Sequence, residues 1–540
     1  MRLLPLLGRG SIALASAATL AACDSDTPTG VASPSPAVSA SVASATGGSV
    51  AALPRTFVNT AVVAPTGRTI TVKAGQNLQN AINSAAPGDV ISVQAGATFT
   101  GNFQLPKKSG SGWITIRSSA HGSLPAGTRV GPAEATKMPK LVAPNGSAAL
   151  RTAAGAHHYR LIGLEIRAST AVSSSNSLVE IGDGSGAQNT VAEIPTHIIL
   201  DRSYVHGTSS QTVKRCIGLH SAHSAIIDSY VSDCHSKTQD SQAIGGWNGP
   251  GPYKIANNYL SGAGENIMFG GADPSISGML PRDIEISRNH IHKPAAWKGK
   301  WLIKNLLELK IGQRVLVEGN VFENNWAAGQ TGFAIVLKST NQGGRATWSQ
   351  TSDVTLRHNI IKNVAHGVNI AAKPEKYAAV KAARFVFTNN VWDRVGSGTY
   401  PGGRLFQVDA IAGLTIESNS AVSTHSALFL HGGRTSALVV RNNAFGKTNY
   451  PLLGDAKGTG KRALDHYAPG WIFTGNVLAG GSASSYPTGN WYPSTTASVG
   501  FASVSAGNLA ISSASKYASA GVNYSTVTSK TSGVVRTYTR

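Results

Sequence analysis

A short sequence motif recurs along the middle of this chain and limits the folds that the chain can adopt. It consists of a run of apolar residues, then a small or amide residue, then another apolar pair. Clear copies are residues 286–291 and 387–392. The marked position recurs every 24 to 39 residues, at Ser203, Ser229, Asn258, Asn289, Asn320, Asn359, Asn390, Asn419, Asn443 and Asn476. Self-similarity with a period of about 20 to 50 residues is typical of a solenoid or array of repeats.

The content of each repeat indicates the kind of solenoid. Each contains two or three runs of four to seven residues rich in Val, Ile, Phe and Tyr, separated by Gly, Asn, Ser and Asp. Helical repeats would instead need long apolar stretches with a period near 3.6. A unit of short strands and turns cannot bury its own apolar face, so it must stack on copies of itself. We therefore predict an all-β fold, a single-stranded right-handed parallel β-helix of about ten or more coils.

The recurring Asn has a structural role in such a coil. Stacked at one corner of every turn, its amide can hydrogen-bond the equivalent residue in the coils above and below, and Asn also tolerates the left-handed backbone that a corner often requires. Residues 77–85 have helical spacing and precede the strand-like segment 88–93. We predict that this N-terminal helix caps the open end of the first coil, because terminal repeats must differ to stay soluble.

The start of the chain does not belong to the repeat. A basic start and an apolar stretch lead to Leu20-Ala21-Ala22-Cys23, which we interpret as a secretion signal over residues 1–22. The last four of these residues resemble the bacterial lipobox, and this resemblance implies cleavage before Cys23 and lipid attachment to its thiol. Residues 23–65 are rich in Ser, Ala, Thr and Pro, which favours a flexible tether.

These segments predict the organisation and location of the protein. The β-helix domain is expected over residues 66–496, and residues 497–540 are expected to form a C-terminal cap or tail. We expect an exported lipoprotein, anchored in a membrane through the lipid on Cys23 and facing the periplasm or the cell surface. We also expect it to act as a monomer.

Charge and cysteine content bear on the partner. The formal net charge of +21 favours an anionic partner. Export and the lack of a nucleic-acid-binding motif argue against nucleic acid, so we expect an anionic polysaccharide; the alternative is a basic surface that only confers solubility or attracts anionic lipid. Cys216 and Cys234 either form a disulfide, which export would permit, or are buried as small apolar side chains.

A second strand follows the Asn corner in each coil, and its side chains alternate between core and surface. We assign as inward the pairs Ile217/Leu219, Ile244/Gly246, Ile267/Phe269, Leu307/Leu309, Ile335/Leu337, Val368/Ile370, Phe406/Val408 and Leu428/Leu430. The outward column is then Gly218 and His220, Gly245 and Trp247, Met268 and Gly270, Glu308 and Lys310, Val336 and Lys338, Asn369 and Ala371, Gln407 and Asp409, and Phe429 and His431. Because coils lie about 4.8 Å apart, Glu308, Lys310 and Lys338 should reach one substrate residue.

The longest loops flank the polar part of this column, at residues 237–252, 270–281, 292–305 and 340–352. Long loops on one side of a rigid solenoid often carry function. They bring five indole rings towards the same coils, and aromatic faces suit sugar rings, although each could simply pack beneath its loop: Trp247, Trp297, Trp301, Trp326 and Trp348. Along the outward column we predict these substrate contacts: His220, Trp247, Asn369, Asp409 and His431.

Three segments in succession carry a resemblance to a known family: residues 264–270, the strand at 306–310 with the following corner at 320–322, and the strand at 334–338. With them the chain resembles the right-handed parallel β-helix polysaccharide lyases, most closely the group of alginate lyases and chondroitinase B. The resemblance implies β-elimination on a uronate-containing polysaccharide. In that family acidic residues and Asn hold a calcium ion that neutralises the uronate carboxylate, a Lys abstracts the C5 proton, and an Arg assists.

The resemblance, which covers roughly residues 70–480 as architecture and 262–340 as motif, also implies roles for individual residues. Glu308 would be a ligand of Ca²⁺ or a neutraliser of the carboxylate, with Glu265 or Asn266 helping from the previous coil. Ca²⁺ is therefore the expected cofactor, and its expected ligands are Glu308, Glu265 and Asn266.

The expected catalytic residues are Lys310, Lys338 and Arg314. Lys338 stands where the family has its Arg. The family's Lys would fall near Arg314, which leaves Lys310 as a displaced candidate base. The family usually has two acids where this chain has only Glu308. The structural alternative is a simple ion pair of Glu308 with either Lys.

Two further functions remain open. A uronate C5-epimerase would use the same groove and the same proton abstraction, and the sequence does not separate it from a lyase. A lipoprotein that binds or displays an anionic glycan without catalysis would have a groove of aromatic rings and cations, with no convergence of Glu308, Lys310 and Lys338. A hydrolase is disfavoured, since it needs two carboxylates that flank the scissile bond, and the Asp residues of this chain are scattered.

Overall fold

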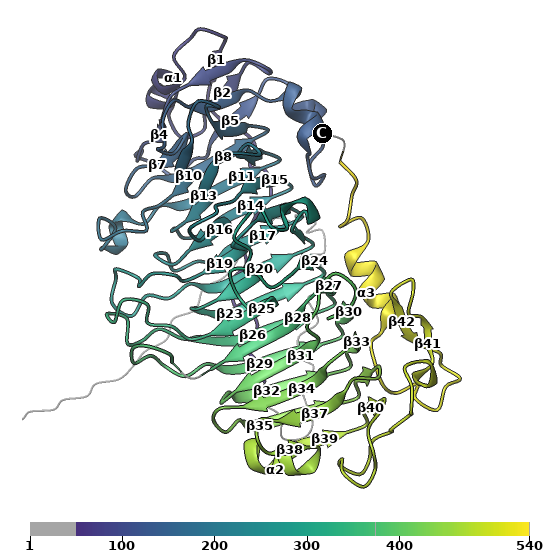
Figure 1. The fold of residues 1–540 in the computed structure, drawn as a ribbon. Helices are drawn as coiled ribbons and strands as arrows, with labels where there is room; N and C mark the ends of the chain where they lie inside the picture. Colours follow the sequence, from purple (N-terminus) through teal and green to yellow (C-terminus); the bar gives the residue numbers. More distant parts are fainter. Residues whose placement is uncertain (1–49, 373, 539–540) are drawn as a thin grey trace, which may run out of the picture. The chain divides into compact units, whose positions relative to one another are not determined.

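The computed structural model describes residues 50–372 and 374–538 (Figure 1). The signal segment, Cys23 and the tether as far as residue 49 lie outside the described residues. Within the described part the chain winds through three sheets of parallel strands, which we name A, B and C, and each full coil adds one strand to each of them. This is the predicted parallel β-helix.

Sheet A has 14 strands in chain order: β1 (Thr69–Val72), β2 (Val90–Val93), β5 (Ile114–Ser118), β8 (His157–Ile162), β11 (Thr196–Asp201), β14 (Ser224–Ile227), β17 (Tyr253–Ala256), β20 (Arg282–Ser287), β23 (Gly312–Glu318), β26 (Thr351–Arg357), β29 (Ala383–Thr388), β32 (Ala412–Glu417), β35 (Ser436–Arg441) and β39 (Ile472–Thr474).

Sheets B and C have 13 strands each. Sheet B contains β3 (Thr98–Thr100), β6 (Lys140–Ala143), β9 (Glu165–Ala168), β12 (Tyr204–His206), β15 (Tyr230–Cys234), β18 (Tyr259–Gly262), β21 (His290–His292), β24 (Val321–Asn325), β27 (Ile360–Val364), β30 (Val391–Val395), β33 (Ser420–Ser423), β36 (Ala444–Phe445) and β40 (Val477–Leu478). Sheet C contains β4 (Phe103–Leu105), β7 (Leu150–Thr152), β10 (Ser174–Ile181), β13 (Thr212–Leu219), β16 (Gln242–Gly246), β19 (Glu265–Phe269), β22 (Asn305–Leu309), β25 (Phe333–Lys338), β28 (His366–Ala371), β31 (Arg404–Asp409), β34 (Ser426–His431), β37 (Tyr450–Gly454) and the antiparallel β38 (Gly458–Thr459).

The remaining elements are short. They are the α-helices α1 (Leu78–Ser84), α2 (Lys461–Tyr467) and α3 (Tyr524–Thr531), the 3₁₀ turns η1 (His121–Ser123), η2 (Pro132–Lys137), η3 (Val191–Glu193), η4 (Ala295–Trp297) and η5 (Ala497–Val499), and a separate antiparallel pair, β41 (Phe501–Ser503) and β42 (Asn508–Ile511).

The strand register of sheet C confirms the predicted alternation. Ile267 pairs with Leu307, and Leu307 with Ile335, so the inward side chains form one continuous row. All of the predicted inward positions are buried, and those with apolar side chains belong to the core that runs through the coils. The outward row beside them pairs Glu308 with Val336 in the next strand. The predicted outward column therefore exists.

The predicted Asn corner is a continuous hydrogen-bonded ladder. The backbone N–H of Asn289 donates to Oδ1 of Asn320 over 2.9 Å. Its side-chain amide donates to the same oxygen and to the carbonyl of Ile255, over 3.0 and 2.8 Å. The pattern repeats from coil to coil and extends one step beyond the predicted members, to Asn490. Each ladder amide thus satisfies buried backbone groups of its neighbours, which would be costly to leave unpaired.

The left-handed residue of this corner is the one before the ladder position, which differs from our expectation that the ladder Asn would take that conformation. Asn257, Arg288, His358 and Asn389 have φ values of 55°, 55°, 57° and 52°, and Gly319 has 67°. The ladder side chain needs an extended strand start to reach the next coil, so the preceding residue makes the turn.

Both ends of the coil stack are covered, one of them as predicted. Helix α1 begins at Asn77, whose side chain accepts a hydrogen bond from Asn80 N, and it buries Leu78 and Ile82 over the first coil. At the other end α2 packs on β34, β37 and β38. The C-terminal residues do not cover that end, because Leu509 and Val527 pack against Val391 on the outside of sheet B (Figure 1).

The N-terminal segment 50–64 is bound to the outside of sheet A, so the flexible tether predicted over residues 23–65 does not extend to residue 65. The backbone N–H of Ala52 donates to Asp353 over 3.2 Å, and that of Arg55 to Asp283 over 2.8 Å. Val58 is buried against residues of β11 and β14. An apolar anchor and two carboxylate acceptors hold a segment whose composition alone indicated flexibility.

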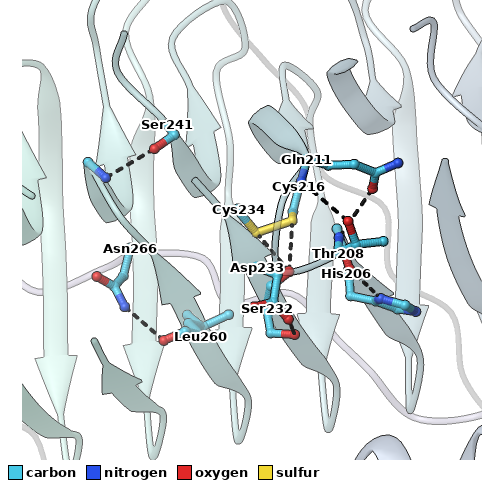
Figure 2. Close-up of a disulfide and its surroundings, with 12 residues drawn as sticks. His206, Thr208, Gln211, Cys216, Ser232, Asp233, Cys234, Ser241, Leu260 and Asn266 are labelled. Atoms are coloured by element: carbon cyan, nitrogen blue, oxygen red, sulfur yellow. Dashed lines mark hydrogen bonds between the residues drawn. A yellow bond between two sulfur atoms is a disulfide. The ribbon is translucent and has the colours of Figure 1, made fainter. Parts of the chain in front are cut away.

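Cys216 and Cys234 form a disulfide that joins β13 of sheet C to β15 of sheet B (Figure 2). Their Cα atoms are 5.6 Å apart and both residues are fully buried. The sequence separation of 18 is less than one coil, yet a corner between two sheets brings the two strands together. Of the two alternatives for these cysteines, the structure favours the disulfide.

Candidate functional site

Glu308 lies on β22 and faces outward from sheet C, where two Lys side chains meet it. Nζ of Lys310 is 3.8 Å from Oε1 of Glu308, and Nζ of Lys338 is 3.7 Å from the same oxygen. Lys310 follows β22, whereas Lys338 ends β25 in the next coil. Their approach therefore depends on the register that pairs β22 with β25. The three residues that the sequence placed together are together in the structure.

The Glu308 carboxylate is buried beneath this surface. Its neighbours in the outward column, Met268 and Val336, are also buried and cover it from both sides. Neither carboxylate oxygen has a hydrogen-bond partner within residues 50–372 and 374–538. Burial of an isolated carboxylate costs several kcal/mol or more, which the two ammonium groups offset. Glu308 is thus a buried carboxyl group that positions two Lys side chains, which are 12% and 14% exposed.

Lys338 reaches into a cavity of about 240 Å³ on the outer face of sheet C. Its Nζ also lies 3.3 Å from Oε2 of Glu375, an exposed carboxylate. Asn369, a predicted substrate contact, lines the same cavity and accepts a hydrogen bond from Gln407 over 3.3 Å. The cavity is lined by Asn305, Gln330, Thr331, Phe333, Val336, Lys338, Asn369, Ala371 and Glu375. The cavity therefore places the Lys338 ammonium group, which is paired with Glu308 and Glu375, near the amide of Asn369.

A second charged cluster adjoins Glu308. From the sequence we predicted Glu265 as part of the site but did not identify its partner Lys304. Lys304 forms ion pairs with Asp240 and with Glu265, whose Oε1 is 3.9 Å away. Gln242 donates a hydrogen bond to Oε2 of Glu265 over 2.8 Å. Burial, with the nearby charges of Glu308 and Asp240, raises the pKa of Glu265 to about 8. Glu265 therefore binds its proton more tightly than an exposed carboxyl group does.

Arg215 extends this charged region along sheet C. Its guanidinium lies 4.7 Å from the Trp247 ring centre. Burial lowers the pKa of Arg215, against the opposing effect of Glu180 and Glu265. Arg215 pairs with Gln242 two residues before the inward pair Ile217 and Ile244, so the alternation of side chains would have placed it in the core and did not predict it here.

Asn266 faces away from Glu308 and serves a structural role. Its Nδ2 donates to the carbonyls of Leu260 and His292, over 2.8 and 2.9 Å, and its Oδ1 accepts from Lys293 Nζ over 3.0 Å. Lys293 is fully buried, and the same ammonium also donates to the carbonyl of Gly262 over 2.6 Å. Burial lowers the pKa of Lys293 to about 7. Asn266 is therefore not the predicted metal ligand.

The expected calcium site does not match the donor groups of this region. Calcium takes six to eight oxygen ligands. No three His, Cys, Asp or Glu side chains of the described part of the chain are placed to hold a metal together. Glu308 is flanked by two ammonium groups, which would repel a dication, and Glu265 is engaged by Gln242 and Lys304. The two Lys side chains supply positive charge at this place.

Arg314 lies on sheet A. It is not in the trough, the name we give to the outer face of sheet C around Glu308, Lys310 and Lys338. Its Nε and one Nη donate to the two carboxylate oxygens of Asp283, over 2.7 and 2.8 Å. Arg314 has a left-handed backbone, with φ 55°, at the corner where β23 begins. Only six residues separate it from Glu308, but the chain has already turned into the next sheet. The structure therefore does not bring Arg314 together with Lys310 and Lys338.

His220 and Trp247 are enclosed by a loop and are not open to substrate, contrary to our prediction. His220 is 1% exposed, and its Nδ1 accepts from the backbone N–H groups of Trp247 and Asn248. Burial lowers the pKa of His220 to about 3. The Trp247 indole donates to the Gly184 carbonyl over 2.8 Å. Both rings stabilise the loop that covers them.

Asp409 and His431 lie in sheet C at some distance from Glu308. Asp409 is on β31, three strands beyond β22, which corresponds to about 14 Å at the spacing of parallel strands. Its Oδ1 accepts from Gly433 N over 2.8 Å. His431 stacks on Phe429 with ring centres 5.4 Å apart. These two positions could contact only a distant part of a long polymer.

No family model and no curated protein matches the chain. Solved structures do match it at low identity. An alginate lyase from Paenibacillus sp. is 14% identical with a TM-score of 0.40, and the match covers 64% of this chain and 99% of that one. A mannuronic acid specific polysaccharide family 6 lyase from human gut microbiota is 12% identical with a TM-score of 0.44. That match covers 79% of this chain and 82% of the other.

The PL6 family alginate lyase AlyGC is 14% identical with a TM-score of 0.46. That match covers 84% of this chain and 56% of that one, so the chain spans little more than half of AlyGC. A bacteriophage tailspike protein also matches, at 12% identity.

The structure bears on the membrane only through its helices. Among residues 50–372 and 374–538, none of the helices has the length and apolar character needed to cross a membrane.

Proposed function

We propose that the protein is exported and lipid-anchored, and that it acts on an anionic, uronate-containing polysaccharide by β-elimination in the trough of sheet C. The observation that carries this proposal is the meeting of Lys310 and Lys338 at the buried Glu308. The net charge of +21 supports an anionic polymer as the partner.

The chemistry assigns the two lysines different roles. Elimination removes a weakly acidic proton beside a carboxylate, so a cation must stabilise the charge that develops there and a base must lie within reach. Lys338, at the mouth of the cavity beside Asn369, neutralises the uronate carboxylate. Lys310 is the base.

Lys310 must first lose its own proton, and Glu308 is the acceptor beside it. Proton transfer from Lys310 to Glu308, whose Oε1 is 3.8 Å from Nζ, leaves a neutral amine that can act as the base. Nζ of Lys310 then takes the C5 proton, the C–H electrons form the C4–C5 double bond, and the C4–O bond breaks. The leaving oxygen takes a proton from the Lys310 ammonium, which returns Lys310 to the neutral amine for the next cycle while Glu308 keeps the proton it first received.

No metal is required in this scheme. Two ammonium groups provide the charge that the family resemblance assigned to calcium, and the donor groups at Glu308 do not fit the ion. Activity should therefore persist in the presence of a calcium chelator.

A second candidate function is binding of the same polymer without catalysis. It is favoured by the burial of Glu308 and by the second ion pair of Lys338, to Glu375. In that case the lysines are structural cations that attract an anionic glycan. An epimerase that uses the same proton abstraction is a third candidate.

The test is incubation of the purified protein with alginate, pectate, glucuronan and chondroitin, with detection of the unsaturated product by its ultraviolet absorbance. Lys310→Ala should lower kcat by about 10² to 10⁴, the usual contribution of a general base. Lys254→Ala is the matched control, because Lys254 makes a similar ion pair, with Glu285 at 3.8 Å, on sheet A. Binding by all three proteins with no product on any polymer would favour the binding function.

A further inference from the structure

A groove of about 480 Å³ lies on the outside of sheet B, away from the trough of sheet C. Its floor is a row of rings in register along the coils, in which Tyr230 pairs with Tyr259 and Tyr259 with His290. The first two rings stack with centres 4.2 Å apart and planes 10° apart. Ligand sites commonly have volumes of about 300 to 1,000 Å³ and a largely aromatic and apolar lining with a few polar groups.

Two segments far apart in the sequence form the walls of this groove. One is the loop around η4, which contributes Trp297 and Trp301. The other is the C-terminal segment, where the Tyr538 ring lies 4.8 Å from that of Tyr230. The rim carries Lys300 and Arg536, both exposed, and neither forms an ion pair within the described residues.

His290 lies in the floor of the groove, and its two ring nitrogens differ in their hydrogen bonding. Its Nε2 is bonded to Glu323 over 2.9 Å, which fixes the ring. Its Nδ1 is buried and has no hydrogen-bond partner within residues 50–372 and 374–538, although the residue is only 5% exposed. Because this nitrogen is enclosed, His290 contributes to the groove through its ring, whose centre lies 5.4 Å from that of Tyr259.

The loop that forms the wall also leads to the trough. After Trp301 it reaches Lys304, which pairs with Asp240 and Glu265 beside Glu308. The groove and the trough therefore share one connecting segment and lie on neighbouring coils. Two sites on one rigid scaffold raise the local concentration of a polymer that engages either of them.

We propose that this groove is a second binding site for an anionic polysaccharide; the identity of the polymer class rests on the proposed function. Ring faces and edges match the apolar faces of pyranose rings, while Asp233 can accept hydrogen bonds from hydroxyl groups. Lys300 and Arg536 lie where they can pair with the acidic groups of the sugar.

The experiment measures hydrogen exchange and affinity with an acidic oligosaccharide, such as a polyuronate fragment. In the Lys338→Ala variant, which disables the trough, the fragment should still protect residues 294–301 from exchange. The double variant Lys300→Ala/Arg536→Ala should bind about tenfold more weakly, the loss expected for two exposed charge-assisted contacts. Lys457→Ala/Lys516→Ala removes two exposed cations elsewhere and should bind as the wild type does.

Each outcome decides between the two proposals. Protection of 294–301, together with no product from the wild-type protein, would support the groove and defeat the elimination. Protection confined to residues 305–310, with product formed, would overturn the groove and leave the elimination intact. Equal protection of 294–301 by a neutral glucan fragment, unchanged affinity of the Lys300/Arg536 variant, or no protection in either segment would also overturn the groove.

Discussion

At the scale of single residues, Glu308 is the position on which the site depends. A buried ion pair is weak support for stability, because apolar side chains of the same volume often serve equally well. The value of Glu308 lies instead in placement: one carboxylate beneath the surface holds Lys310 and Lys338 on the same trough.

Glu265 gives a prediction on pH. Because its folded-state pKa of about 8 lies above the ordinary 4.5, the folded protein keeps a proton that the unfolded chain has lost between these values. Its contribution to stability is therefore fully present below pH 4.5 and is lost as the pH rises through about 8. Glu265→Gln keeps a neutral side chain and should be more stable than the wild type at pH 8, by about 2–4 kcal/mol.

The measurement is the free energy of unfolding in urea, for the wild type and Glu265→Gln, from pH 4.5 to 8. The difference between the two proteins should grow with pH. A constant difference would mean that Glu265 does not hold a proton in the folded protein.

Asn320 gives a prediction on stability. Asn320→Leu leaves the N–H of Asn289 and the carbonyl of Ile286 without their partners, at a cost of about 1–3 kcal/mol each. Urea unfolding should show this loss, while the specific activity of the folded fraction stays close to that of the wild type. Asn80→Leu, on the exposed side of α1, is the control. An unchanged unfolding midpoint for Asn320→Leu would contradict the role of the ladder.

At the scale of elements, the strands of the trough could be predicted and their surroundings could not. The repeat fixes the register, so the pairing of Glu308 with Val336 follows from counting residues along the sequence. Arg314 was misplaced because a corner lies between it and Glu308. The repeat of the sequence does not show at which residue the chain leaves one sheet and enters the next. Lys304 was missed because it lies in a loop, and loop conformation depends on contacts such as that with Asp240.

The N-terminal segment 50–64 gives a prediction at the same scale. A chain that begins at residue 65 loses the contacts of Ala52 and Arg55 with Asp353 and Asp283, and the burial of Val58. We expect its unfolding free energy to fall by roughly 2–5 kcal/mol. A chain that begins at residue 50 keeps these contacts and should melt as the full chain does. Equal Tm values for the two shortened chains would show that the segment does not stabilise sheet A.

At the scale of the whole molecule, the coil stack explains how one chain presents chemistry on more than one face. Each coil contributes to three sheets, so the coils that carry Glu265 and Glu308 on sheet C also carry Tyr259 and His290 on sheet B. The fold class followed from the repeat alone. Which faces are open did not, because loops such as the one over His220 close part of the predicted column.

The most direct test of the elimination is the mass of the products formed from a uronate polymer in heavy water. The account predicts shortened chains whose new ends are lighter by one water than those of a hydrolysed chain, formed by the wild type and by Lys254→Ala but not by Lys310→Ala. Hydrated ends would indicate hydrolysis, intact chains that carry deuterium would indicate an epimerase, and intact unlabelled chains would indicate binding alone; any of these results would contradict it.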